Sequence, residues 1–334
     1  MTIARAYLTA LEALGYTETE AHFLYLVATH SGYFVARQFL GFTGARWGKR
    51  TTLFWTKLQG LKHARIEHFP KSGVVYHLFA RRLYRQIGRE HLRNRREHEI
   101  EFVRRRIAML DFVLAHSDHR YLETEQDKLR FFCEDRKVPA HALPSKTYHG
   151  QRAVQPTVRY FVDKFPMFVE SAVSPSSVTF SYVQDAEANL TGFVHHLEAY
   201  LPLFRHLPEF RFLYLARDSA HFDKARELFQ SLVTIPLESK PAEDLLRYFS
   251  VRKQWDLRNY SALSEADLIF RNQARARFAG ARFEHLYRAW KAEQMTDSII
   301  RSDFAGSDVP HSVEFQSRFL PLFNGASTKP EENG

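Results

Sequence analysis

Residues 41–79 read GFTGARWGKRTTLFWTKLQGLKHARIEHFPKSGVVYHLF, and this stretch decides which fold the first part of the chain can adopt. It begins with apolar residues at helical spacing, among Lys and Arg side chains and without an Asp or Glu before Glu67. Two short runs of alternating apolar residues then lie on either side of PKSG, a strong turn signal. The order predicts a basic helix followed by a β-hairpin.

Further helices are predicted before this stretch. Apolar residues in TIARAYLTALEALGY recur at helical spacing, and Gly15 supplies the left-handed residue that often ends a helix. Thr17 and Glu20 have the spacing of a capping box at the start of the next helix, and YFVARQFLGF predicts a short third one. Helix, helix, turn, basic helix and hairpin is the order of a winged helix-turn-helix domain, which we expect over residues 1–85.

The basic helix is expected to have one core-facing side and one DNA-facing side. Its core-facing candidates are the apolar residues Trp47, Leu53, Phe54, Leu58 and Leu61. In a winged helix, the N-terminal residues of such a helix reach base edges in the major groove. The candidate contacts to bases or adjacent phosphates are Arg46, Lys49, Arg50, Thr51 and Thr52, and the candidates for the DNA backbone are Lys57 and Lys71.

The basic excess of the chain is confined to its first third. The 334 residues include 47 Lys and Arg against 38 Asp and Glu, a formal net charge of +9. Residues 1–120 contain 20 of those cations and 10 of those acids, so the remainder is close to neutral. This asymmetry indicates an anionic partner for the first part of the chain.

Residues 86–118 predict a long basic helix that connects two domains. Its early part is polar nearly all round, and a core-facing side begins at Phe102. Arg93 and Arg96 could follow DNA phosphates beyond the footprint of the winged helix. A solvated helix with Glu and Arg pairs four residues apart explains the same pattern equally well.

The rest of the chain completes an α+β protein. Residues 119–240 alternate strand-like runs, such as SSVTFSYVQD and FRFLYLA, with helical ones, which predicts a mixed α/β domain with TIPLE as a candidate last strand. The run VRYFVDKFPMFVE is also expected to be a strand, and its aromatic residues to lie in the core. Residues 241–304 predict a helical region, and residues 305–334 a largely disordered tail.

This combination resembles the replication-relaxation family of plasmid and mobile-element proteins. The resemblance lies in the helix and wing of residues 44–79, in VTFSYVQDAE running into FVHHLEAYLPLF, and in FRFLYLARDSAHFDKARELF. It is architectural, has no signature motif and covers most of residues 1–235. It implies DNA binding in plasmid maintenance, mobilisation, replication or transcription regulation, and a second domain similar to restriction endonucleases.

That similarity makes a magnesium-dependent nuclease the alternative function. Such cleavage needs carboxylates that share a cation and a lysine that assists the attacking water. The plausible acids are Asp163, Asp185 and Glu187, but the strand before Asp185 continues as QDAEANL without that lysine. We therefore expect a nuclease-like sheet without the cleavage residues, and no metal or cofactor, while the question of enzymatic activity stays open.

Other metal chemistry has little support in the sequence. The nearest approach to ligand pairs is His116 with His119 and His195 with His196. In a chain with 17 histidines such pairs arise readily by chance.

Several features indicate a cytoplasmic protein. Cys133 is the single cysteine, so an intrachain disulfide cannot form. The first residues include Arg5 and Glu12 where a signal peptide would need an apolar stretch, and no run is long enough to span a bilayer. We expect no membrane partner.

The leading hypothesis is a sequence-specific protein that binds double-stranded DNA as a homodimer, since two half-sites raise the affinity of such domains. Its α/β domain would dimerise it or recruit a protein partner. A third class, a protein-docking adaptor, would require an acidic partner to cover the basic helix.

Overall fold

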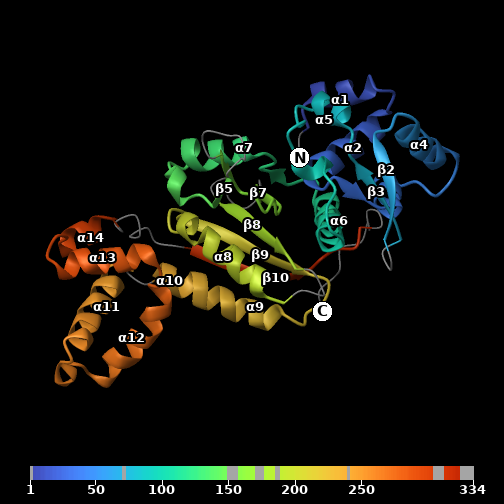
Figure 1. Ribbon diagram of the computed structural model, residues 1–334. Coiled ribbons are helices and arrows are strands. Elements are labelled where there is room, and N and C mark those ends of the chain that lie inside the picture. Colours follow the sequence, from blue (N-terminus) through green and yellow to red (C-terminus); the bar gives the residue numbers. More distant parts are fainter. Residues whose placement is uncertain are drawn as a thin grey trace.

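The computed structural model shows a mixed α+β protein. An N-terminal unit, a central sheet with its helices and a C-terminal helical lobe follow one another in space (Figure 1). The described residues are 3–69, 73–148, 157–169, 177–184, 189–238, 241–303 and 312–323.

The N-terminal unit has the predicted order of helices and hairpin. A small antiparallel sheet of strand order β1-β3-β2 joins its helices. Strand β1 was not predicted: it takes the first residues of the run expected to be a short helix, and its two aromatic side chains are fully buried. The elements are α1 (Arg5–Glu12), α2 (Glu18–His30), β1 (Tyr33–Phe34), α3 (Ala36–Thr43), α4 (Lys49–Gly60), β2 (Ala64–Phe69) and β3 (Gly73–Leu78).

Local signals set the ends of the first helices. The capping box of α2 is confirmed, because Thr17 and Glu20 each accept a hydrogen bond from the other's backbone N–H. Gly15 follows α1 with φ +95°, as the sequence predicts. Gly32 follows α2 with φ +84°, and a Cβ atom there would lie 2.2 Å from the Asn94 carbonyl oxygen. Only glycine fits that position.

The core-facing side of α4 differs from the prediction in part. Phe54 and Leu58 are buried as expected, but Trp47 is 61% exposed and Leu53 55% exposed, and Leu61 is also exposed. Positions three or four residues apart lie on the same face of a helix, so a buried residue of α4 must have this spacing from other buried residues. The buried face consists of Thr51, Phe54, Trp55 and Leu58.

The predicted connector helix over residues 86–118 was wrong. The chain forms the short helix α5 (Arg81–Gln86), a 3-10 turn (Arg93–Arg95) and helix α6 (Ile100–Ala115). Gly88 follows α5 with φ +64°, a left-handed conformation that a continuous helix cannot contain. Helix α6 is buried along most of its length and packs against α2, α3 and β1, so it belongs to a core rather than to solvent.

Arg106 of α6 shows why an arginine cluster need not be solvated. Its side chain is 3% exposed, and its guanidinium donates hydrogen bonds to the His30 carbonyl (3.2 Å) and to Asn94 Oδ1 (3.0 Å). The Asn94 amide in turn donates to the carbonyls of Ala28 and Thr29. Burial lowers the pKa of Arg106 to about 10. The cation therefore caps the C-terminal end of α2, where the helix dipole favours positive charge.

Asp111 of α6 is fully buried and fixes α6 to α3. Its carboxylate accepts both guanidinium Nη groups of Arg37 at 2.6 Å and the Gln38 amide at 2.8 Å. Arg37 also donates to the carbonyl of Phe323, at the end of the described chain. One carboxylate thus connects α3, α6 and the segment after the last strand.

The central sheet has the strand order β10-β9-β8-β7-β4, with β8, β9 and β10 parallel and β7 and β4 antiparallel. One predicted strand and the predicted disordered tail were wrong. Residues 235–238 of TIPLE form helix α10, and the disordered tail predicted for residues 305–334 contains β10 instead. The strands are β4 (Arg120–Tyr121), β7 (Met167–Val169), β8 (Val178–Val183), β9 (Glu209–Ala216) and β10 (Ser312–Phe319).

The run predicted as one strand around residue 164 contains two, in different sheets. Strand β6 (Thr157–Tyr160) pairs with β5 (Ser145–Tyr148) in a separate two-stranded sheet, while β7 joins the central sheet. The three phenylalanines of this run, Phe161, Phe165 and Phe168, are buried, so their predicted core role is confirmed. Helix α7 (Glu125–Leu129) and a π-helical turn (Arg130–Asp135) precede β5.

Helices cover both faces of the central sheet. On one face, Phe204 of α8 (Thr191–Phe204) packs against Phe180 of β8, with ring centroids 5.0 Å apart. Phe168 pairs opposite Thr179 and therefore points to the other face, where its ring lies 5.9 Å from that of Phe112 in α6. Helix α6 is thus shared by the N-terminal unit and the sheet, and one continuous apolar core joins them.

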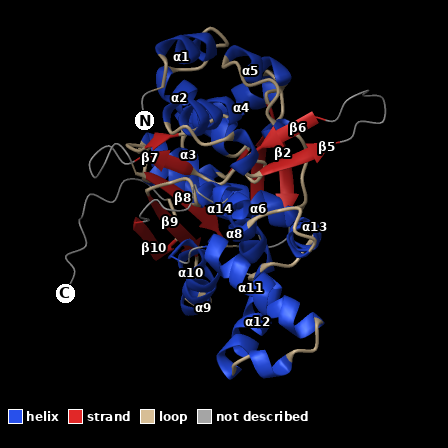
Figure 2. Cartoon of the chain, turned by 90° about the vertical axis from the view of Figure 1, so that its left-hand side faces the viewer, coloured by secondary structure: helices blue, strands red, loops and turns tan. Residues whose placement is uncertain are grey.

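Residues 241–303, most of the region predicted to be helical, form α11 to α14. Its four helices form a lobe with its own apolar core, and the chain then returns to the sheet as β10. Figure 2 shows α11 and α12 extending away from the sheet. The helices after β9 are α9 (Phe222–Phe229), α10 (Ile235–Glu238), α11 (Pro241–Asp256), α12 (Glu265–Arg277), α13 (Ala281–Lys291) and α14 (Asp297–Asp303). Among the described residues, no helix has both the length and the apolar composition needed to cross a membrane.

The buried pair of Arg37 and Asp111 gives a stability prediction. Arg37→Ala leaves the buried Asp111 carboxylate with only the Gln38 amide, and we expect the free energy of unfolding to fall by about 3 kcal/mol in urea denaturation. Arg5→Ala, which breaks an exposed pair with Glu18, is the control and should change it little. Equal decreases in the two variants would contradict the assigned role of Asp111.

Candidate nucleic-acid interface and basic pocket

Helix α4 lies at the outer edge of the N-terminal unit (Figure 1). Of its predicted DNA contacts, Arg46, Lys49 and Thr52 are exposed. Trp47 precedes the helix and stacks on Trp55 with ring centroids 6.1 Å apart, while most of its surface stays exposed. The outward side of α4 therefore combines cationic, hydroxyl and apolar groups.

Thr51 was expected to contact DNA, and that prediction was wrong. Its side chain is 1% exposed, and its hydroxyl accepts a hydrogen bond from the Gly48 N–H (2.9 Å) and donates one to the Gly48 carbonyl (2.8 Å). Because Gly48 has no side chain that could cap the helix, Thr51 closes its first turn instead.

Lys57 is already paired within the protein. Its ammonium lies 2.6 Å from Glu20 Oε2 and over the ring of Tyr16. The predicted contact with the DNA backbone would have to compete with that ion pair. Lys71 and the side chain of Arg50, two further predicted contacts, lie outside the described residues.

The two predicted arginines of the supposed connector lie on the 3-10 turn and beside it. The guanidinium of Arg93 lies 4.6 Å from the centre of the Tyr148 ring and donates to its hydroxyl at 3.3 Å. Arg96 is exposed, and its carbonyl accepts the hydroxyl of Tyr33. Arg93 thereby borders a cavity rather than extending the surface of α4.

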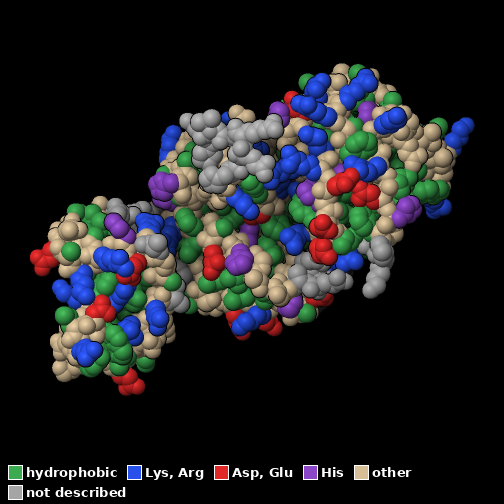
Figure 3. Space-filling model, viewed as in Figure 1, with side chains coloured by type: hydrophobic (Ala, Val, Ile, Leu, Met, Phe, Trp, Pro, Cys, Tyr) green, Lys and Arg blue, Asp and Glu red, His purple; other side chains and the backbone are tan. Residues whose placement is uncertain are grey.

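This cavity of about 490 Å³ lies between the N-terminal unit and the sheet domain, and we call it the basic pocket. Lys and Arg side chains gather where these two parts meet (Figure 3). Glu123 joins the two walls: it accepts the Tyr25 hydroxyl and the Arg89 guanidinium, each at 2.5 Å. Burial raises the pKa of Glu123, although these two partners oppose the shift.

Two lysines of the basic pocket were missed by the sequence analysis. Lys128 of α7 is 5% exposed, and burial lowers its pKa to about 8. Burial and the neighbouring cations lower the pKa of Lys164 to about 7. A sequence signal existed for Lys128, which precedes the buried Phe132 by four residues and so lies on the apolar side of its helix. Lys164, in the turn after β6, had no comparable signal.

Asp163, a predicted nuclease carboxylate, is bonded to α8. One of its oxygens lies 2.6 Å from His196 Nδ1, and the other accepts the Tyr200 hydroxyl at 2.9 Å. Burial raises the pKa of Asp163, but the close contact with His196 and the hydrogen bond from Tyr200 lower it further, so the net shift is downward. Both carboxylate oxygens are thus engaged beside a second cavity of about 370 Å³.

Of the other candidates for metal chemistry, His116 and His119 stack with ring centroids 5.4 Å apart, and His116 Nδ1 is hydrogen-bonded to the Phe112 carbonyl. His195 is exposed whereas its neighbour His196 is buried, so the two side chains face different surroundings. Asp185 and Glu187 lie outside the described residues. Within the part of the chain that the structure describes, no three His, Cys, Asp or Glu side chains are grouped as a metal site requires.

Comparison with known proteins returned no match: no family model, no curated protein and no solved structure is similar enough to this chain. The resemblance to the replication-relaxation family therefore stays a prediction. Function has to be argued from the residues themselves.

The role of Thr51 can be tested by stability. Thr51→Val keeps the shape of the side chain but removes both hydrogen bonds to Gly48, and we expect the free energy of unfolding to fall by about 1 kcal/mol. Thr52→Val is the matched control: it removes a single exposed hydrogen bond, from the Thr52 hydroxyl to the Gly48 carbonyl at 3.1 Å, and should cost less. If Thr52→Val is the more destabilising of the two, the capping role is wrong.

Asp163 gives a pH-dependent prediction. Because folding lowers its carboxyl pKa, its ionised form stabilises the protein above the unfolded pKa of about 4, and this contribution is lost as the pH falls through the folded value. Asp163→Asn should therefore lower the melting temperature at pH 7, with a gap to wild type that narrows below pH 4. The exposed Asp118→Asn is the control. A gap that stays constant over pH 3–7 would contradict the ion pair with His196.

Proposed function

We propose that this chain binds double-stranded DNA through α4, as the recognition helix of a winged helix-turn-helix domain. The observation that supports it most is the division of α4 into two faces. Its inner face is held in the core, and its outer face presents Lys49 and Thr52. Arg46, three residues before the helix, is also exposed, and the stretch contains no acidic residue before Glu67. The helix order and the β1-β3-β2 sheet agree with such a domain.

The described side chains narrow the proposed contacts. Thr51 is no longer proposed as a DNA contact because its hydroxyl closes the first turn of α4. Lys57 already forms an ion pair with Glu20. Arg46 and Lys49, at the N-terminal end of the helix, would reach bases or phosphates, and Thr52 would contact either. The exposed Trp47 and Leu53 add apolar surface, which suits thymine methyl groups in the major groove.

The regulatory or maintenance role on a plasmid or mobile element is proposed from the resemblance alone. A homodimer, with the α/β domain joining two copies or recruiting a protein partner, stays a prediction too. The basic excess of the first 120 residues supports a polyanionic partner for the N-terminal unit.

The nuclease remains the alternative, without an observation that favours it. Asp163 uses both carboxylate oxygens for His196 and Tyr200, and a cation would have to displace one of them. Intact DNA after incubation with magnesium would speak against cleavage, and nicking that disappears in Asp163→Ala would support it.

The proposed DNA contact of α4 is tested with a double variant that combines Arg46→Ala and Lys49→Ala. We expect the double variant to bind a duplex from the neighbourhood of its own gene at least tenfold more weakly. The slope of log affinity against log salt concentration should become less steep by about one unit for each phosphate that the variant no longer neutralises, because fewer counterions are released. Fluorescence anisotropy over a salt series measures both quantities.

Lys224→Ala is the control for that experiment. Lys224 is exposed and pairs with Glu227 on α9, which lies away from α4 in both views (Figures 1 and 2). The control should bind like the wild type. If the double variant keeps wild-type affinity and salt slope, α4 is not the DNA-binding helix. If the wild type binds no duplex at all, DNA binding is wrong, and the protein-docking adaptor becomes the leading hypothesis.

A further inference from the structure

The basic pocket contains more positive charge than its own acids neutralise. Each of its three acidic residues has a partner: Glu123 bonds to Arg89, Glu125 to Arg159 and to the backbone N–H of Tyr160, and Asp127 to Thr124. Among the described residues, Lys128 and Lys164 have no ion-pair partner. Asp163, Asp127 and Glu125 attract Lys128 at longer range, and its ammonium lies over the Phe161 ring, 5.4 Å from the ring centre, but none of the three acids forms an ion pair with it.

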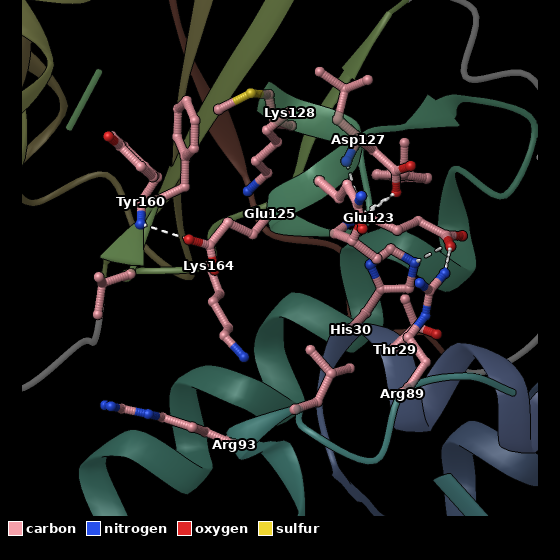
Figure 4. A pocket seen from close by; sticks show the side chains of 18 of the residues that line it. Thr29, His30, Arg89, Arg93, Glu123, Glu125, Asp127, Lys128, Tyr160 and Lys164 are labelled. Atoms are coloured by element: carbon pink, nitrogen blue, oxygen red, sulfur yellow. Dashed lines mark hydrogen bonds and ion pairs between the residues drawn. The ribbon is translucent and has the colours of Figure 1, made fainter. Parts of the chain in front are cut away.

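The unpaired cations converge on one space from different parts of the fold. Figure 4 shows Lys128 and Lys164 extending into the open centre of the pocket, with Arg93 at its border. Lys128 comes from α7, Lys164 from the turn after β6, and Arg93 from the 3-10 turn. Bringing such charges together without a counter-ion costs free energy, which a bound anion would recover.

A further observation concerns the backbone that borders the pocket. Phe161 and Lys164 both have φ in the left-handed region, at 50° and 56°, which costs a non-glycine residue free energy. Backbone strain of this kind is common where side chains are held in place for binding.

We propose that the basic pocket binds a small phosphorylated molecule of nucleotide size, with its phosphoryl group held by Lys128, Lys164 and Arg93. A phosphoryl group supplies the negative charge and the acceptor oxygens that these donors need. This inference does not depend on DNA binding by α4.

The size and the lining of the pocket suggest a ligand larger than phosphate alone. A cavity of about 490 Å³ falls in the range of small-molecule sites. Aromatic residues line it as well, and Arg93 already stacks on one of them, Tyr148. A flat heterocyclic ring with an attached phosphate would use both kinds of lining.

The charge of Lys164 makes binding depend on pH. The groups that face it come from four elements and the adjoining turns: Arg106 of α6, Lys128 of α7, Arg93 of the 3-10 turn, Arg159 of β6, and the neighbouring His98 and Asp163. With a pKa of about 7 in the folded state, Lys164 is protonated below that pH and loses its proton above it. An anion therefore binds best below pH 7 and more weakly as the pH rises, and a bound anion raises that pKa.

The experiment measures the melting temperature of the full chain with sulfate, inorganic phosphate, a nucleoside monophosphate or a short DNA duplex. At pH 6 we expect phosphate and the nucleotide at saturation to raise it by about 2 °C or more. Sulfate keeps a constant charge, so its affinity by calorimetry should fall at least tenfold between pH 6 and pH 8.5, as Lys164 and then Lys128 lose their protons.

Lys164→Met and Lys128→Met should each abolish the stabilisation by phosphate and by the nucleotide. Without ligand at pH 6, Lys164→Met should melt above the wild type, since it removes a partly buried charge surrounded by cations; this also shows that the variant folds. Lys224→Met is the matched control, and the α4 variant Arg46→Ala, Lys49→Ala should keep the full response to phosphate.

Three results would overturn the proposal. The first is no stabilisation by phosphate or by the nucleotide at pH 6. The second is a stabilisation that Lys164→Met and Lys128→Met both retain, which would place the anion elsewhere. The third is a response to duplex DNA alone that these variants abolish, which would make the pocket part of the DNA surface. Loss of DNA binding in the α4 variant with an unchanged phosphate response would separate the two sites.

Discussion

The buried carboxylate of Asp111 is the constraint on which the arrangement of this protein depends. A carboxylate that is shielded from solvent must accept hydrogen bonds from the protein, and Arg37 and Gln38 of α3 donate them. That requirement fixes α6 against α3. Because Arg37 also bonds to the Phe323 carbonyl, the end of the described chain is held at the same place. A single charge thereby positions segments almost three hundred residues apart.

Helix α6, once fixed, joins the two larger parts of the molecule. Its arginine Arg106 caps α2 on the side of the N-terminal unit, and its Phe112 packs on Phe168 of the sheet. The two parts therefore share a core instead of being connected by a solvated helix. Their close contact also creates the basic pocket, whose cations come from α7, the turn after β6 and the 3-10 turn.

The two sites considered for function differ in how far the sequence could reveal them. The outer face of α4 was predictable in outline, because charge and helical periodicity are local properties. Its details were not: Thr51 looked like a DNA contact but closes the helix, and Trp47 looked like core but is exposed. The basic pocket could hardly be predicted, since Lys128 and Lys164 lie 36 positions apart and acquire their common surroundings only through packing.

By itself, the sequence determined the elements whose signals lie within a few residues. The capping box of Thr17 and Glu20, the hairpin of residues 64–78 and the order of helices in the N-terminal unit are of this kind. Only the tertiary structure decided that β10 pairs with β9 about a hundred residues earlier, and that Arg106 and Asp111 are buried. The physical reason is that strand pairing and the burial of a charge depend on partners remote in sequence, whereas caps, turns and helical faces are set by neighbours.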